Sequence, residues 1–162
     1  MDQLTKSFTY YEFQNSEELS NQDQELVKLS REATKSAYAP YSGFYVGAAV
    51  ILEDGTIIKG NNQENAAYPS GLCAERVAVF SASAVYPNVT IKAIAISAYS
   101  EEITIDKPIS PCGSCRQVIL EYEKKQDTPI KIILTGQKGK VIIINSMSDL
   151  LPLNFTDKDL NK

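Results

Sequence analysis

The sequence contains no histidine, and this absence removes several kinds of catalytic site. Nucleophilic catalysis by a Ser-His or Cys-His pair requires an imidazole base, so neither is possible here. A transition metal would have to be held by thiolates or carboxylates. Cysteine is scarce as well, because the 162 residues include only three, which cannot all pair within one chain. The spacing of these cysteines is therefore the main guide to function.

Long apolar runs and basic stripes are also missing. No hydrophobic stretch exceeds a few residues, so the sequence predicts no membrane span and no membrane partner. The N-terminal segment MDQLTKSFTYYEF lacks a basic region followed by an apolar stretch, so we expect no secretory signal peptide and a cytoplasmic location. The net charge is -4 and the lysines are scattered, which makes nucleic acid an unsuitable partner.

The composition that remains fits one globular domain. With 43% hydrophobic residues, a chain of this length can bury a core without disulfides. We expect residues 1–19 to form an N-terminal extension and residues 20–162 a single domain. The extension either adds an edge strand at residues 8–13 or remains a loose tail.

Hydrophobic periodicity predicts alternating helices and strands. Apolar residues at helical spacing begin after Asn21 and are stopped by Pro40, which predicts the first helix. A hairpin is expected at residues 46–52 and 56–59, and further strands are expected at 91–97, 130–135 and 141–144. Further helices are expected at 73–85, 112–125 and 146–151. This order predicts an α/β fold, with a five-stranded mixed sheet sandwiched by helices.

Cys112 and Cys115 form a CxxC motif at the predicted start of a helix. Residues three apart share a helix face, with Cβ atoms roughly 5 to 6 Å apart, so both sulfurs can reach one ion. Taken alone, such a motif is equally consistent with a redox dithiol or with two buried small apolar residues.

Cys73 also stands at a predicted helix start, and Glu75 follows it two residues later. The positive end of a helix favours thiolates, so two helices can direct their N-termini at one metal. A structural zinc site normally has four Cys or His ligands, whereas this chain has three such residues. Three protein ligands with an open fourth position are typical of catalytic zinc, and Glu75 would then be free to move protons.

These motifs match the zinc-deaminase signature in its all-cysteine form, CAE followed by PCGSC. Around them, four strings together resemble the homo-tetrameric class of zinc-dependent cytidine deaminases: YAPYSGFYVGAAV, NNQENAAYPSGLCAERVAVF, SPCGSCRQVILEY and LLPLNF. The resemblance covers roughly residues 20–156 and implies that family's α/β/α fold, with residues 20–162 as a single cytidine/deoxycytidylate deaminase-type catalytic domain.

The resemblance implies one Zn²⁺ per chain, held by Cys73, Cys112 and Cys115, with no organic cofactor. Glu75 would serve as the proton shuttle in hydrolytic attack on C4 of cytosine. The implied reaction converts cytidine and 2′-deoxycytidine to uridine and 2′-deoxyuridine plus ammonia, a step of pyrimidine salvage. Arg76 resembles the family arginine that donates hydrogen bonds to the ligand sulfurs; without the family it would read as a surface residue.

The resemblance also implies a substrate-binding set, with a homo-tetramer in which neighbouring subunits complete each site. Its members are Phe44, Asn62, Glu64, Tyr68, Ala74 and Phe155. Asn62 and Glu64 would bind the ribose, although on their own they read as a polar turn. Without the family, Phe44 reads equally well as an aromatic residue of the hydrophobic core. Phe155 reads as a residue that attaches the C-terminal tail to the core. Gln63 stands where the family usually has an aliphatic residue, which is expected to alter local packing more than recognition.

Three other functions compete with this interpretation. A deaminase of a cytosine-bearing antibiotic such as blasticidin S shares CAE and PCGxCR, but the NxEN string and Phe155 favour a nucleoside. A polynucleotide-editing deaminase would need a basic channel, which this acidic chain lacks. A structural zinc or redox-sensing module without turnover is disfavoured by the third cysteine and by the spare Glu75.

Overall fold

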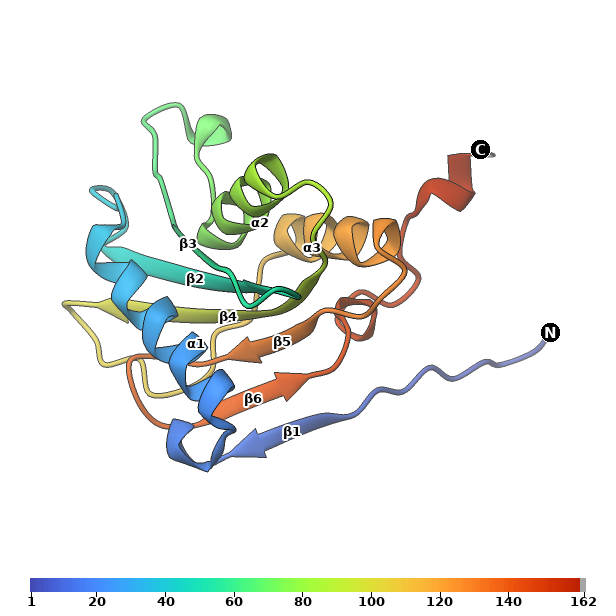
Figure 1. Ribbon diagram of the computed structural model, residues 1–162, viewed down its shortest axis with the longest axis horizontal. Coiled ribbons are helices and arrows are strands. Elements are labelled where there is room, and N and C mark those ends of the chain that lie inside the picture. The colour runs from blue at the N-terminus through green and yellow to red at the C-terminus, as the bar shows by residue number, and fades with distance from the viewer. Residues whose placement is uncertain (161–162) are drawn as a thin grey trace.

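A six-stranded mixed sheet forms the centre of the molecule in the computed structural model, which describes residues 1–160 (Figure 1). The strands lie in the order β1-β6-β5-β4-β2-β3, with β4 and β5 parallel and the other neighbours antiparallel. Their bounds are β1 Tyr10–Phe13, β2 Phe44–Leu52, β3 Ile57–Asn61, β4 Ile91–Ser100, β5 Lys131–Leu134 and β6 Val141–Ile144.

The sixth strand comes from the N-terminal extension, so the expected count of five strands was wrong. Strand β1 pairs antiparallel with β6, with Tyr10 opposite Ile144 and Phe13 opposite Val141. This pairing satisfies the outer backbone groups of β6, which would otherwise form an open sheet edge. Of the two alternatives for the extension, the edge strand is therefore the correct one over residues 10–13.

Helices cover both faces of the sheet, which confirms the predicted sandwich. Helix α1, Asn21–Ala33, lies on one face, and helices α2, Ala74–Val85, and α3, Gly113–Lys125, lie on the other (Figure 1). Gly60 on β3 allows α2 to approach closely, because a Cβ at this position would lie 2.5 Å from the backbone nitrogen of Ala78. This close packing fixes the N-terminal end of α2 against the sheet.

Two helices are shorter than their sequence patterns predict. Helix α1 ends at Ala33 and continues only as a 3-10 turn over Thr34–Ser36. The expected closing helix at residues 146–151 is reduced to a 3-10 turn over Met147–Asp149, after which the chain turns sharply through Leu153 at φ 55°. No helix within residues 1–160 has both the length and the apolar character needed to cross a bilayer.

Candidate active site

The three cysteines meet where α2 and α3 begin. Cys73 and Cys112 are the residues immediately before these helices, and Cys115 lies in the first turn of α3. The Sγ atom of Cys112 is 3.8 Å from that of Cys73 and 3.5 Å from that of Cys115, and all three sulfurs lie within 4.8 Å of one another. Two helix N-termini thus direct their positive ends at one cluster of sulfur atoms.

The chemistry of this donor set fits zinc. Hydrogen bonding, first from the Cys115 thiol and then from Arg76, lowers the pKa of Cys73 to about 5. The pKa of Cys115 is raised, mainly because its thiol proton is shared with Cys73 and also because it is buried. The cluster therefore stabilises a thiolate, and a metal would take the place of the shared protons. Three thiolates in this arrangement suit a soft, tetrahedral ion such as zinc.

Arg76 lies beside the sulfur cluster. One terminal nitrogen of its guanidinium is 3.7 Å from the Sγ of Cys73 and 3.5 Å from the carbonyl oxygen of Gly71. Within residues 1–160, its buried Nε has no hydrogen-bond partner. The hydrogen bond to Cys73 also raises the pKa of Arg76. The contact agrees with the predicted donation to a ligand sulfur.

Glu75 is buried in the first turn of α2, with 4% of its surface exposed. Burial is the largest cause that raises the pKa of its carboxyl group, and the nearby charge of Cys73 raises it further. A raised pKa makes the protonated form of a glutamate more accessible, which suits a group that must both accept and release a proton. Its position beside Cys73 therefore gives the site an acid-base group that is separate from the three sulfurs.

A cavity of about 610 Å³ opens over the sulfur cluster, a size typical of small-molecule sites. Eight of the residues predicted from the sequence line this cavity: Phe44, Asn62, Glu64, Tyr68, Cys73, Glu75, Arg76 and Cys112. Residues from β2, from the segment after β3 and from the starts of two helices are thus brought together. The lining thus includes two sets of polar atoms, the Asn62 and Glu64 side chains and the sulfur cluster, which we call the two ends of the cavity.

The side chain of Asn62 acts as a strand partner at the beginning of β2. Its Oδ1 accepts a hydrogen bond of 2.7 Å from the backbone N–H of Val46, and its Nδ2 donates one of 2.9 Å to the carbonyl of Phe44. Both contacts fix the backbone that carries the Phe44 ring into the cavity. The amide retains one N–H and one oxygen lone pair for a further partner.

Glu64 is held by residues that the sequence interpretation did not single out. Its carboxylate accepts a hydrogen bond of 2.5 Å from the Ser42 hydroxyl and others from the backbone N–H groups of Ser42 and Tyr41. The Ser42 hydroxyl is the largest cause that lowers the pKa of Glu64. Ser42 stands in the quoted string YAPYSGF, but the contact joins residues 22 positions apart and has no local sequence signal.

Three predicted site residues lie outside the cavity lining. Cys115 is fully buried behind it as part of the sulfur cluster, and Ala74 is fully buried at the start of α2. Phe155 is 56% exposed, and its carbonyl accepts a hydrogen bond from the side chain of Gln117. Tyr68 lines the rim yet is 77% exposed, with its ring edge-on to that of Tyr41. A single chain therefore does not bring Phe155 to the cavity.

Three sulfurs at two helix starts, a buried carboxylate beside them and a nucleoside-sized cavity above define a zinc-dependent hydrolytic deaminase of the α/β/α type. Residues 20–128 match the family described as the cytidine and deoxycytidylate deaminase zinc-binding region. The chain therefore belongs to the cytidine and deoxycytidylate deaminase family.

Individual relatives agree with this assignment. The chain is 43% identical to a cytidine deaminase of Sporosarcina psychrophila over 139 residues, which are 85% of this chain and 94% of the relative. The crystal structure of cytidine deaminase from Burkholderia pseudomallei superimposes with a TM-score of 0.71 at 38% identity, covering 85% of this chain and all of that one. A blasticidin-S deaminase of Bacillus cereus is 30% identical over 140 residues, 85% of this chain and 95% of the relative.

Proposed function

We infer that this protein is a zinc-dependent cytidine deaminase, which hydrolyses cytidine to uridine and ammonia. The observation that carries the inference is the cluster of three sulfurs at the base of the cavity, next to a buried glutamate. Cys73, Cys112 and Cys115 would hold the metal. Zinc, when bound, supplies the Lewis acidity that makes water nucleophilic near neutral pH.

Glu75 would carry the protons of the reaction. Hydrolysis at C4 of the pyrimidine requires a proton to leave water, and protons to reach N3 and then the departing amino group. A carboxyl group whose pKa is raised by burial can alternate between base and acid in these steps. Arg76 would offset the surplus negative charge of three thiolates around a divalent ion, because its guanidinium contacts the Cys73 sulfur.

The other end of the cavity would bind the sugar. Asn62 and Glu64 present an amide and a carboxylate, groups that pair readily with hydroxyls, and both have remaining hydrogen-bonding capacity. Phe44 would form part of the apolar wall beside the pyrimidine. Since the 3′-hydroxyl, which both nucleosides carry, offers these groups a partner, we propose that 2′-deoxycytidine is also a substrate, and that the enzyme serves pyrimidine salvage.

Metal analysis combined with the change in ultraviolet absorbance on deamination tests this function. Purified protein should contain close to one zinc per chain and convert cytidine to uridine with release of ammonia. Blasticidin S is the competing substrate to include, because the chain also resembles a blasticidin-S deaminase. A metal-free preparation with full activity would exclude the zinc mechanism, and faster turnover of blasticidin S than of cytidine would reassign the substrate.

We also propose that the active enzyme is a homo-tetramer whose sites are completed by neighbouring subunits. Phe155, Tyr68 and Leu153 are 56%, 77% and 97% exposed in the single chain, which is a large apolar surface to leave in water. Association would bury them, with Phe155 reaching the cavity of another copy. Phe155→Ala should raise the KM for cytidine about threefold to tenfold, in proportion to the ~0.5–1.5 kcal/mol of an aromatic contact, without loss of zinc.

The control for this prediction is Phe80→Ala, because Phe80 is also partly exposed but packs on Tyr122. Sedimentation velocity reports the assembly state of both variants. A fully active monomer, or unaltered kinetics in Phe155→Ala, would contradict the shared site. The cytoplasm is the proposed compartment, because three thiols within 4.8 Å stay reduced only in a reducing environment.

A further inference from the structure

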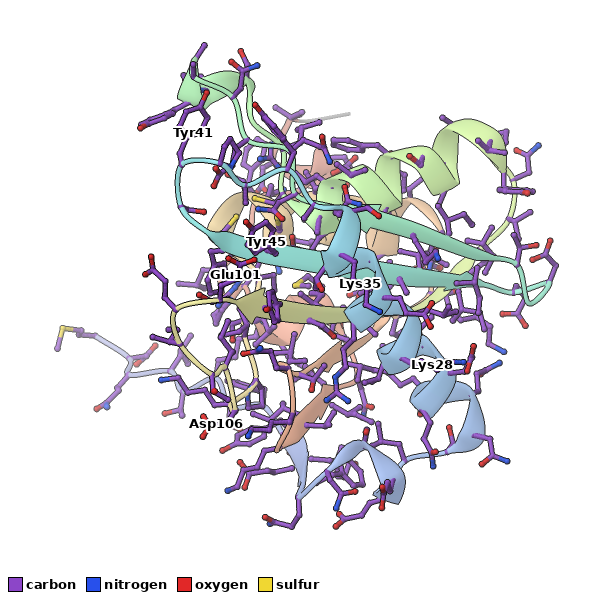
Figure 2. The ribbon with its side chains drawn as sticks, turned by 90° about the vertical axis from the view of Figure 1, so that its left-hand side faces the viewer. Lys28, Lys35, Tyr41, Tyr45, Glu101 and Asp106 are labelled. Carbon is purple, nitrogen blue, oxygen red and sulfur yellow. The ribbon has the colours of Figure 1, made fainter. Side chains whose placement is uncertain are left out.

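A second hollow, of about 750 Å³, lies at the other face of the sheet, beside the C-terminal end of α1. Its principal lining residues are Arg31, Thr34, Lys35, Tyr45, Tyr99 and Gln137. None of the residues lining this hollow lines the deamination cavity. Figure 2 shows Lys35, Tyr45 and Glu101 on this side of the molecule, with Lys28 farther away on α1. We call it the α1 hollow.

Arg31 presents a fixed guanidinium to the α1 hollow. Its Nε donates a hydrogen bond of 3.1 Å to the carbonyl of Gly136, and one terminal nitrogen donates one of 2.9 Å to the Thr135 hydroxyl. Among residues 1–160, the other terminal nitrogen has no hydrogen-bond partner, and the guanidinium forms no ion pair. The group is half-buried, and burial lowers its pKa. An anion would therefore stabilise Arg31 more than water does.

Two tyrosines form an aromatic surface next to this cation. Tyr45 on β2 and Tyr99 on β4 are directly opposite each other, with ring centroids 6.1 Å apart and planes tilted by 47°. Tyr99 is 39% exposed, so part of its ring is available to a ligand. Exposed aromatic faces of this kind bind planar rings by offset stacking.

The remaining groups favour an anion with hydrogen-bond acceptors. Lys35 is exposed and forms no ion pair within the described chain, so Arg31 and Lys35 outweigh the single carboxylate of Glu101. The Gln137 side chain accepts a hydrogen bond from the backbone of Ile105 through Oε1, which orients the amide and leaves its NH₂ free to donate.

We propose that the α1 hollow is a second small-molecule site, which binds an anion attached to a planar ring, with a nucleoside monophosphate as the representative of this class. Arg31 and Lys35 bind the anion, and the Tyr45–Tyr99 surface binds the ring. The Gln137 amide donates to an acceptor on the ring or sugar. This site differs in position and in charge from the cavity that holds the sulfur cluster, so its ligand need not be a substrate.

Equilibrium dialysis with radiolabelled uridine 5′-monophosphate tests the proposal on the intact protein. Uridine in excess keeps the deamination cavity filled, so the measured binding reports other sites. Tyr99→Leu should weaken binding at least fivefold, the lower limit for losing a base-stacking aromatic. Lys35→Gln should weaken it about threefold, as expected for an exposed charge pair. Lys28→Gln, on α1 and outside the hollow, is the matched control and should bind as the unaltered protein does.

Two further measurements distinguish the contribution of the ring from that of the anion, and binding at this site from catalysis. Inorganic phosphate alone should bind at least tenfold more weakly than the nucleotide, and the deamination rate with cytidine should be the same in all three variants. The proposal is overturned if excess uridine abolishes nucleotide binding, or if the Lys28 variant loses as much affinity as the Lys35 variant. It is also overturned if Tyr99→Leu changes the sedimentation coefficient instead of binding, because the hollow would then be an interface between copies.

Discussion

The two ends of the deamination cavity differ in how far their polar groups are already satisfied. At the sulfur end, the cysteines share protons with one another, and the buried Nε of Arg76 has no partner among the described residues. The end formed by the Asn62 amide and the Glu64 carboxylate, proposed to bind the sugar, is called the sugar end. Each of these two groups accepts or donates at least two hydrogen bonds within the chain. The sulfur end is thus completed only by a ligand, whereas the sugar end is preorganised by the fold.

This difference predicts unequal consequences of mutation. A change at the sulfur end should remove chemistry and leave the fold intact, because the sulfurs hydrogen-bond one another and not the backbone of the sheet. A change at the sugar end should weaken substrate binding and the local fold together, because the same side chains do both.

The largest effect is expected for Cys112→Ala. Removing one of three sulfurs leaves two ligands, so zinc content should fall from one per chain to near zero and deamination to the background rate. Zinc analysis and the cytidine assay measure both losses. Ser114→Ala, in the same exposed turn, is the matched control and should retain metal and activity. Retention of one zinc per chain by the Cys112 variant would show that the metal lies elsewhere.

Glu75→Gln should separate metal binding from proton transfer. The amide keeps the size of the carboxylate but cannot accept or release a proton under these conditions, so kcat should fall by about 10²-fold to 10⁴-fold. Zinc content should be unchanged, because the three sulfurs are untouched. Glu121→Gln, at an exposed position on α3, serves as the control. Near-normal turnover in the Glu75 variant would mean that another group moves the protons.

Sequence patterns predicted the sulfur end better than the sugar end, for a physical reason. The three clustered sulfurs come from two short motifs at helix starts, where spacing along the chain determines spacing in space. The hydrogen bond between Ser42 and Glu64 instead depends on how two loops approach each other, and local periodicity carries no information about that. The same limit explains why residues 8–13 read equally well as a strand or a tail, since β1 forms only by pairing with β6.

Asn62→Ala tests whether the sugar end couples binding to folding. The change leaves the backbone N–H of Val46 and the carbonyl of Phe44 without their side-chain partner, at a cost of about 1–3 kcal/mol for each unsatisfied group that stays buried. The KM for cytidine should rise about tenfold or more, and the Tm should fall. Asn62→Asp keeps the acceptor for Val46 and should lose less stability. A raised KM with an unchanged Tm would contradict the coupling.

The smallest effect is expected in the pH dependence of stability, and it concerns Glu64. The hydrogen bond from Ser42 lowers the pKa of this carboxyl in the folded protein, so the folded state binds its proton less readily than the unfolded chain. The resulting stabilisation is fully present above the unfolded pKa of about 4.3 and is lost as pH falls through the lower folded value. Glu64→Gln does not titrate and should lack this contribution at every pH.

Thermal unfolding of the unaltered protein and of Glu64→Gln, measured in parallel from pH 7 to pH 3, checks this expectation. The unaltered protein should have the higher Tm at pH 7, and the difference should shrink below about pH 4, as the folded carboxylate becomes protonated. Glu101→Gln is the control, because Glu101 is a surface glutamate that lines the α1 hollow instead. A Tm difference that stays constant over this range would show that the Ser42–Glu64 contact acts through shape rather than charge, and the sugar end would then be preorganised by packing alone.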